Sequence, residues 1–362
     1  MKTLQHLKNL ILPVFLFGSL SGALTGALIT LYRFCASHVI ALSGKAYEFL
    51  RENPPWIFAA AAVLAGAALL YGALYRRFPN LRGGGIPTSI AALRGMQPVK
   101  WVCDIVGVFL LSLTTFFFGV PLGNEGPSVQ MGTAIGDGCV RVMPRRCRAW
   151  SRYAMTAGSC AGFTAATGAP ISGIMFALED AHRRISPMII LTSFFAVVFS
   201  HFTAALLSPL FGIDTQLFSV PSLPVLEAAQ MWIPLVVGLA VGLFAVLFLK
   251  YYGVVHHFMK RTLKKLPASL RIFGVLVLTL LLGLCREEFI STGHHLIAHL
   301  FERGTPILLL FLILLVRSTL TLCANTAGMT GGLFLPIMAL GAAVTAILAE
   351  IAARLVPGSQ AY

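Results

Sequence analysis

Long apolar stretches alternate with short polar or glycine- and proline-rich connections along the whole chain. Crossing the hydrocarbon core of a bilayer takes about 20 residues of helix, and fewer where a helix is broken or re-entrant. The pattern therefore predicts an all-α polytopic membrane protein, with one transmembrane domain over residues 1–362. The expected helices cover 10–34, 56–75, 100–120, 127–143, 150–167, 170–180, 187–208, 231–255, 270–285, 305–323 and 332–354.

Several of these helices are too short to cross, and they begin or end at clusters of glycine and proline. The clusters are Gly83–Pro87, Gly123–Pro127, Gly168–Pro170 and Gly331–Pro336. Broken helices are tolerated in a membrane only where their unpaired backbone groups are buried or line a cavity. Two of the breaks take matching places in a first half, about 10–208, and a second half, about 231–362, which predicts an inverted repeat with a site between the halves.

Composition supports a membrane protein and excludes several other classes. Hydrophobic residues make up 57% and charged residues 11% of the chain, whereas a soluble domain carries about 25% charged residues. The net charge is +14, but the basic residues lie in connections between apolar stretches, without the aromatic platform that stacks bases. We therefore expect no nucleic-acid partner and, with no catalytic constellation in view, no enzymatic activity.

Basic residues also predict the orientation of the chain. They cluster at the N-terminus and in the connections near residues 80, 146 and 262, whereas the other connections are balanced or acidic. By the positive-inside rule, the N-terminus and the basic connections are cytoplasmic. The seven cysteines form no C-x-x-C pair, so they predict small buried hydrophobes rather than disulfides or a metal site.

Three of the glycine clusters open a predicted helix: Gly83–Pro87, Gly123–Pro127 and Gly331–Pro336. A helix N-terminus offers free N–H groups and about half a positive charge, which attract anions. A glycine turn before a helix is usually only structural. Three such starts without a basic side chain inside them nevertheless predict an anion held by backbone dipoles, weakly enough to leave again.

Glu125 stands between two glycines in one of these breaks. An acid within the membrane is costly and is functional by default. At a helix start, its carboxylate would compete with the anion for the same N–H groups. We therefore expect a gate that blocks when charged and swings away when protonated. The alternative is a carboxylate that only caps the helix.

Two further features are candidates with a structural alternative. Glu179 and Asp180 precede Arg183 and Arg184, so they are either inner proton acceptors that relay to Glu125 or members of an interfacial ion pair, which the residues alone favour. Phe334 lies in a glycine-proline break, where the positive edge of its ring could touch an anion or simply pack.

These motifs together resemble the CLC family of chloride channels and proton-coupled chloride transporters. Gly83–Pro87 (GGGIP) resembles the family element GSGIP, Gly123–Pro127 (GNEGP) resembles GREGP or GKEGP, and Gly332–Pro336 (GLFLP) resembles GxFxP. The stretches ATGAPISGIMFALED and STGHHL add support, in family order, and the resemblance runs from about residue 10 to 356.

The resemblance implies a homodimer with one pore in each subunit, built from two inverted halves. It assigns Glu125 as the external gate, Phe334 as a neighbour of the central anion, and Asp180 with Glu179 as the inner proton relay. Chloride is the expected bound substrate, and no cofactor or metal is expected. The anion-binding backbone is expected to come from Gly84, Gly85, Ile86, Gly126, Phe334 and Leu335.

Three departures from the family pattern change the expectation. Gly84 stands where the family usually has a serine that binds the anion, which puts chloride selectivity in question. Asn124 replaces an arginine or lysine and removes a positive charge beside the gate. Asp180 keeps a carboxylate where channels usually have an apolar residue, which favours a transporter.

The sequence ends at Tyr362, shortly after the helix that follows the third motif. The family has several further helices, one bearing a tyrosine at the central site, so the second half is expected to be incomplete, without a cytoplasmic regulatory domain. The expected function is chloride/proton antiport in a bacterial inner membrane. The alternatives are a passive chloride channel of the same family and a truncated, non-transporting member.

Overall fold

The computed structural model describes residues 2–215, 231–263, 265–301 and 305–355, and Tyr362 lies outside them. The described residues form helices joined by short connections. The longer helices are α1 (Lys2–Glu52), α2 (Trp56–Arg77), α4 (Trp101–Phe117), α5 (Glu125–Val142), α6 (Ser151–Thr167), α8 (Pro187–Phe211), α9 (Trp232–Leu263), α10 (Ala268–Cys285), α12 (Ile307–Ala327) and α13 (Phe334–Leu355). The short helices are α3 (Ile86–Leu93), α7 (Pro170–Phe176) and α11 (His294–Phe301).

Seven of the described helices are long and apolar enough to cross a membrane, namely α1, α2, α8, α9, α10, α12 and α13. This confirms an all-α, multi-pass membrane protein. The predicted range 10–34 was too short, because α1 continues to Glu52. Its polar end is held in place where Arg51 donates a hydrogen bond to the Gly283 carbonyl at 2.8 Å and pairs with Glu287 at 3.1 Å.

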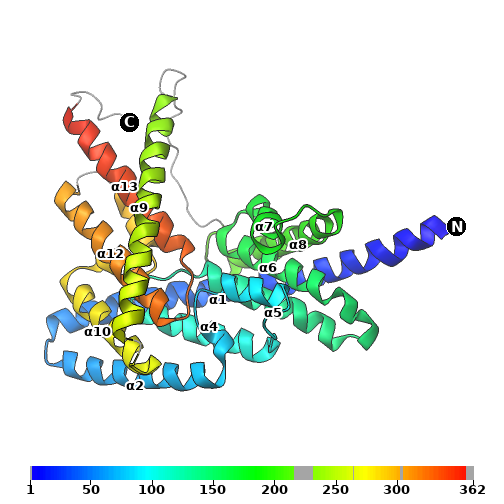
Figure 1. The fold of residues 1–362 in the computed structure, drawn as a ribbon, viewed down its shortest axis with the longest axis horizontal. Coiled ribbons are helices and arrows are strands. Elements are labelled where there is room, and N and C mark those ends of the chain that lie inside the picture. The colour runs from blue at the N-terminus through cyan, green and yellow to red at the C-terminus, as the bar shows by residue number, and fades with distance from the viewer. Residues whose placement is uncertain (1, 216–230, 264, 302–304, 356–362) are drawn as a thin grey trace.

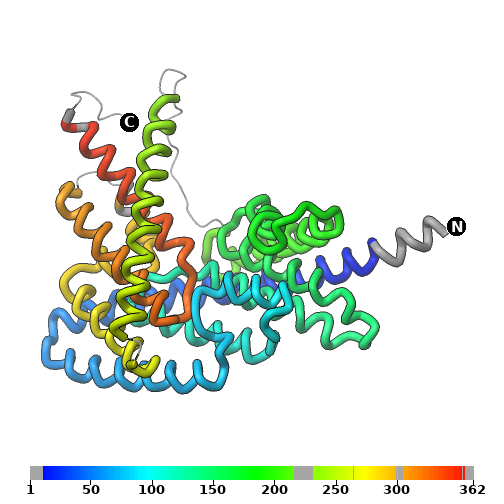
Figure 2. The backbone as a smooth tube through the Cα atoms, in the orientation of Figure 1, coloured from blue at the N-terminus to red at the C-terminus, as the bar shows by residue number. Residues whose placement is uncertain are grey.

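The helices form two groups joined by α1 (Figure 1). Helices α5 to α8 lie together on one side, and α9, α12 and α13 lie on the other. The backbone trace follows α1 along the length of the molecule past both groups (Figure 2). The two groups do not follow the division of the chain into halves, because residues of α1, α2 and α4 share one apolar cluster with residues of α10, α12 and α13.

Helix α5 lies at the centre of the first group, and every residue from Glu125 to Val140 is buried. Its backbone touches that of α6 so closely that a Cβ on Gly136 would meet Met155 Cα at 2.8 Å, and one on Gly158 would meet Gly136 N at 3.2 Å. Small residues allow this approach in membrane helices. Because other helices surround α5, the polar residues along it do not face lipid.

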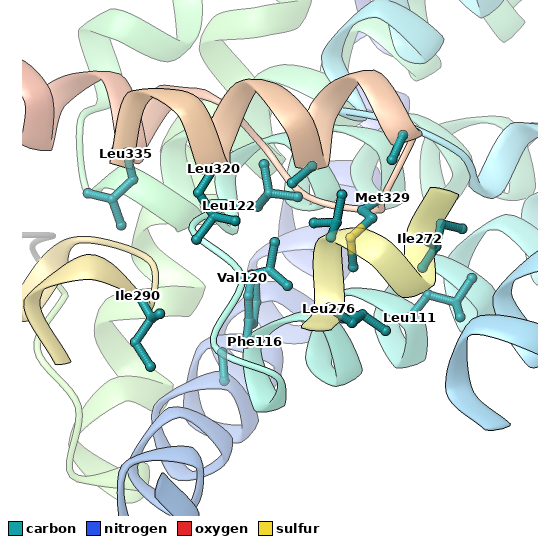
Figure 3. Packing of buried hydrophobic residues seen from close by; sticks show 14 of the residues in the cluster. Leu111, Phe116, Val120, Leu122, Ile272, Leu276, Ile290, Leu320, Met329 and Leu335 are labelled. Atoms are coloured by element: carbon teal, nitrogen blue, oxygen red, sulfur yellow. The ribbon is translucent and has the colours of Figure 1, made fainter. Parts of the chain in front are cut away.

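One large apolar cluster holds the connection before α5 against the start of α13. Figure 3 shows Val120 and Leu122 of that connection beside Leu320 and Leu335. In a membrane, such packing is stabilised by van der Waals contact rather than by removing apolar surface from water. The cluster therefore fixes two of the predicted breaks relative to each other.

All seven cysteines are free, as the absence of C-x-x-C pairs predicted. Cys139 and Cys160 are buried, but Cys103 and Cys285 are exposed, so the expectation of buried cysteines was wrong for these two. Both lie at a helix end, where packing against neighbouring helices is incomplete.

Candidate anion site

The three predicted helix starts come together in the structure. Gly123 and Gly332 each donate their N–H to the carbonyl of the other at 2.7 Å, which joins the starts of α5 and α13. The N–H of Gly331 donates to the Gly83 carbonyl at 3.4 Å, which brings in the start of α3. Three helix N-termini that are far apart in the sequence thus meet through backbone hydrogen bonds.

The glycines of these motifs allow the backbones to touch. Gly85 has a φ of +79°, and a Cβ there would overlap the Gly126 carbonyl. A Cβ on Gly126 would itself meet Gly332 Cα at 2.9 Å, so a larger residue fits at neither position. Gly84 differs, because the nearest atoms to a Cβ there would be Gly331 O at 3.6 Å and Pro87 Cδ at 4.0 Å.

Glu125 is the first residue of α5, and its side chain is 0% exposed. Its carboxylate folds back over Gly123 and faces the backbone N–H groups of Glu125 itself and of Leu335. Among the residues that the structure describes, neither oxygen reaches hydrogen-bond geometry with a partner. A buried carboxylate without partners is costly, and this one lies where the starts of α5 and α13 would favour an anion.

The described contacts include no hydrogen bond by which Glu125 would cap α5. Asn124 is the N-cap residue of α5, and no side chain caps this helix with a hydrogen bond. The Asn124 carbonyl instead accepts the N–H of Ser128 at 3.0 Å and its hydroxyl at 2.7 Å.

Phe334 begins α13 and extends the site toward α7. Its ring meets Phe163 of α6 edge to face at 5.6 Å, and Phe163 stacks on Phe176 of α7 at 5.7 Å. Ile86 packs on the same apolar cluster, and its N–H donates to the Gly84 carbonyl at 3.0 Å. That amide of the expected anion-binding backbone is therefore engaged within its own motif.

Glu179 and Asp180 lie on a π-helical turn, Ala177–His182, that directly follows α7. Both are exposed, and among the described residues neither pairs with Arg183 or Arg184. The ion pair that the residues alone favoured is therefore not formed. No contact joins either carboxylate to Glu125, and their connection to the site runs through α7 and its Phe176.

Two arginines within apolar helices were not among the predicted site residues. Arg317 of α12 is 1% exposed and donates to the carbonyls of Glu288, Ile290 and Ser291 at 2.6–3.0 Å. Arg33 of α1 donates to the carbonyl of Ala165 at 3.2 Å. The signal was present, because a lone charge inside a predicted membrane helix is functional or structural by default.

Interrupted helices whose N-termini converge on a buried carboxylate define a membrane protein of the anion-transporting class. Residues 66–362 match the family model described as voltage gated chloride channel, and the chain belongs to this family. The resemblance seen in the motifs is therefore confirmed.

Related sequences and solved structures agree with this assignment. The chain is 29% identical over 346 residues to the H(+)/Cl(-) exchange transporter ClcA of Vibrio vulnificus, covering 91% of this chain and 71% of that protein. It is 27% identical over 352 residues to ClcA of Salmonella arizonae, covering 96% and 74%. A slow cyanobacterial Cl⁻/H⁺ antiporter has the same fold, with a TM-score of 0.82, 21% identity, and coverage of 96% of this chain and 81% of that one. A CLC-type fluoride/proton antiporter gives 0.74 with 20% identity, over 94% and 81%.

Proposed function

We propose that this protein exchanges chloride for protons across the membrane. The observation that carries the proposal is the buried, unpartnered carboxylate of Glu125 at the junction of three helix starts. The sequence relatives named above are H(+)/Cl(-) exchange transporters, which supports the same activity.

The mechanism follows from competition between two anions for one place. The charged Glu125 carboxylate faces the N–H of Leu335 and blocks the position that chloride would take. Protonation removes the negative charge, so the attraction to the helix starts weakens and the side chain can leave. Chloride then enters the site. The proton bound to Glu125 can be released toward the other side of the membrane, in the direction opposite to chloride.

Asp180, with Glu179, is proposed to pass protons between the cytoplasm and Glu125. Both carboxylates are exposed on the turn after α7, and neither is occupied by the neighbouring arginines. Phe176, at the end of α7, stacks on Phe163, which contacts Phe334 at the start of α13. This packing gives a fixed spacing between the inner carboxylates and the anion site.

The test of the gate uses purified protein in liposomes. Glu125→Gln imitates the protonated state, so chloride flux should persist while its pH dependence and the coupled proton movement are lost. Glu48→Gln, at an exposed position of α1, is the control and should behave as the unaltered protein. Wild-type pH dependence in Glu125→Gln would rule out the gating role.

The test of coupling is a chloride gradient with proton uptake as the readout. Asp180→Ala should stop proton movement while chloride flux continues, and Glu179→Ala tests whether its neighbour does this instead. If the unaltered protein moves chloride but no protons, the passive channel is the correct function. If it moves no chloride under any gradient, the chain is a non-transporting member of the family.

We further propose a homodimer in a bacterial inner membrane, with the N-terminus in the cytoplasm. Helix α8 presents an exposed apolar ridge at every fourth residue, which suits packing against a second copy. The ridge consists of Ile190, Phe194, Val198, Phe202, Leu206 and Leu210. Subunit counting by single-molecule photobleaching in liposomes should give two copies per particle, and one copy at all protein densities would contradict the dimer.

A further inference from the structure

The gate motif of this chain carries no positive charge of its own, because Asn124 stands beside Glu125. A cation nevertheless lies close to the gate, and it comes from a different helix. We propose that Arg33 of α1 supplies the positive charge that Asn124 lacks and attracts chloride to the start of α5. This inference deepens the proposed chloride transport and rests on it.

The packing register between α5 and α6 places Arg33 at the level of Glu125. Three close contacts pair residue 136 with 154, 132 with 158, and 128 with 162, so the two helices run antiparallel. Continuing this register by one turn brings Ala165 opposite Glu125. Nη1 of Arg33 donates to the carbonyl of Ala165 at 3.2 Å. The guanidinium is therefore anchored on the α6 residue that faces the gate.

The packing of α1 against α5 also places Arg33 at the level of Glu125. A Cβ on Gly132 of α5 would lie 3.0 Å from Thr25 Cγ2 of α1. From this contact α1 rises by about 12 Å to Arg33, and α5 runs back by about 10 Å to Glu125, at 1.5 Å per residue. Phe17 of α1 packs with Val140 of α5 and Ala154 of α6, so α1 runs parallel to α6 and antiparallel to α5. Arg33 and Glu125 therefore reach similar heights.

Arg33 is held in position by backbone groups. Nη2 donates to the Asp214 carbonyl at 2.8 Å and Nη1 to the Thr215 carbonyl at 3.2 Å, in the segment after α8. Two acidic side chains attract the guanidinium, namely exposed Asp214 and buried Glu125. The carbonyls of Ala165, Asp214 and Thr215 carry no net charge and so do not neutralise the guanidinium, which acts on chloride whenever the Glu125 carboxylate is neutral or displaced.

A purely structural anchor is the alternative role for Arg33, because its hydrogen bonds join α1, α6 and the segment after α8. The two roles differ in their response to charge. An anchor depends on the shape and donors of the guanidinium. A chloride attractor depends on the charge itself, acts through space, and is screened by salt.

The first experiment measures chloride flux into liposomes as a function of chloride concentration. Arg33→Gln should raise the half-saturating chloride concentration about five- to tenfold, as expected for loss of one partly screened charge. Arg33→Lys keeps the charge and should stay within about twofold of the unaltered protein on the same argument. The control is Arg286→Gln, which removes an arginine that pairs with Glu288 at 3.7 Å in a different part of the chain.

The second experiment moves the charge. In the Arg33→Gln background, Asn124→Arg should restore at least half of the lost chloride affinity, because the new cation adjoins Glu125. Asp214→Asn should have the opposite effect to Arg33→Gln and strengthen chloride binding, because it removes a competing negative charge. Failure of both the lysine variant and the relocated arginine to preserve affinity would assign Arg33 a structural role only.

Calorimetric titration of the same variants with chloride in detergent keeps this test separate from transport. Weaker binding in Arg33→Gln and recovery with Asn124→Arg support the inference even if no variant moves chloride. Unchanged binding and unchanged flux in Arg33→Gln overturn it while leaving chloride transport intact. Absence of flux in the unaltered protein, with charge-dependent binding retained, overturns only the proposed transport.

Discussion

At the scale of single residues, Gly84 is the glycine of the three motifs that can accept a side chain. A Cβ there would have no heavy atom nearer than 3.6 Å. A serine hydroxyl adds one hydrogen bond to a dehydrated anion, about 0.5–1.5 kcal/mol net, and about 1.4 kcal/mol is tenfold in affinity. Gly84→Ser should therefore raise the preference for chloride over the less hydrated nitrate by up to about tenfold on this estimate.

Relative uptake of chloride and nitrate into liposomes measures this effect. Gly85→Ser is the matched control, because a Cβ there would overlap the Gly126 carbonyl at a positive φ. That variant should yield little folded protein by size-exclusion chromatography. Strong chloride selectivity already present with Gly84, or no change in Gly84→Ser, would show that a backbone amide or water fills the missing position.

The sequence alone predicted which glycine and proline breaks would form the site and that Glu125 would lie in one of them. Backbone anion sites need glycine and proline at defined spacing, so the breaks and Glu125 were visible in the motifs. Arg33 was not assigned, because its place near Glu125 depends on the packing register of α1, α5 and α6. No local pattern in one helix contains that register.

At the scale of elements, the predicted helix 170–180 is two elements, α7 and the π-helical turn Ala177–His182. Periodicity cannot distinguish a π-turn from the end of an α-helix. His182 closes this turn, and its Nε2 lies 2.8 Å from the Thr156 hydroxyl of α6. The turn is therefore tied at its C-terminal end to α6 of the first group of helices.

His182 makes the stability of this turn depend on pH. Burial lowers the pKa of His182 below its usual range, and Arg184, Arg152 and Arg94 lower it further. The unfolded chain therefore binds a proton more readily than the folded one, so stability is fully present above the unfolded pKa of about 6.5 and is lost as pH falls below it. Replacing the titrating group should therefore remove this loss of stability on acidification.

His182→Gln tests this linkage by thermal unfolding of the purified protein from about pH 7.5 to about pH 5, across the ordinary histidine pKa. The unaltered protein should lose melting temperature on acidification, and the variant should lose less. His257→Gln, at an exposed position of α9, should retain the wild-type slope. Equal slopes in all three proteins would contradict the role of His182.

At the scale of the whole molecule, hydropathy and the breaks predicted the number and order of most long helices. The hydropathy pattern missed α11 and the polar end of α1, because both depend on contacts outside their own segment. Arg51 at the end of α1 is held by Gly283 and Glu287, which are far along the chain. Arg317 likewise fixes the connection before α11 through three backbone carbonyls.

Orientation in the membrane is a whole-molecule prediction that two native cysteines can test. Cys285 is exposed at the end of α10, next to the acidic connection expected outside, and Cys147 lies in the basic turn Arg145–Trp150 expected inside. By the positive-inside rule, the N-terminus shares the side of Cys147.

Variants retaining only one of these two cysteines, with the other six replaced by alanine, separate the signals. A membrane-impermeant maleimide added to intact cells should label Cys285 and spare Cys147, and both should react after permeabilisation. Labelling of Cys147 in intact cells, with Cys285 protected until permeabilisation, would reverse the proposed orientation and place Asp180 on the outer side.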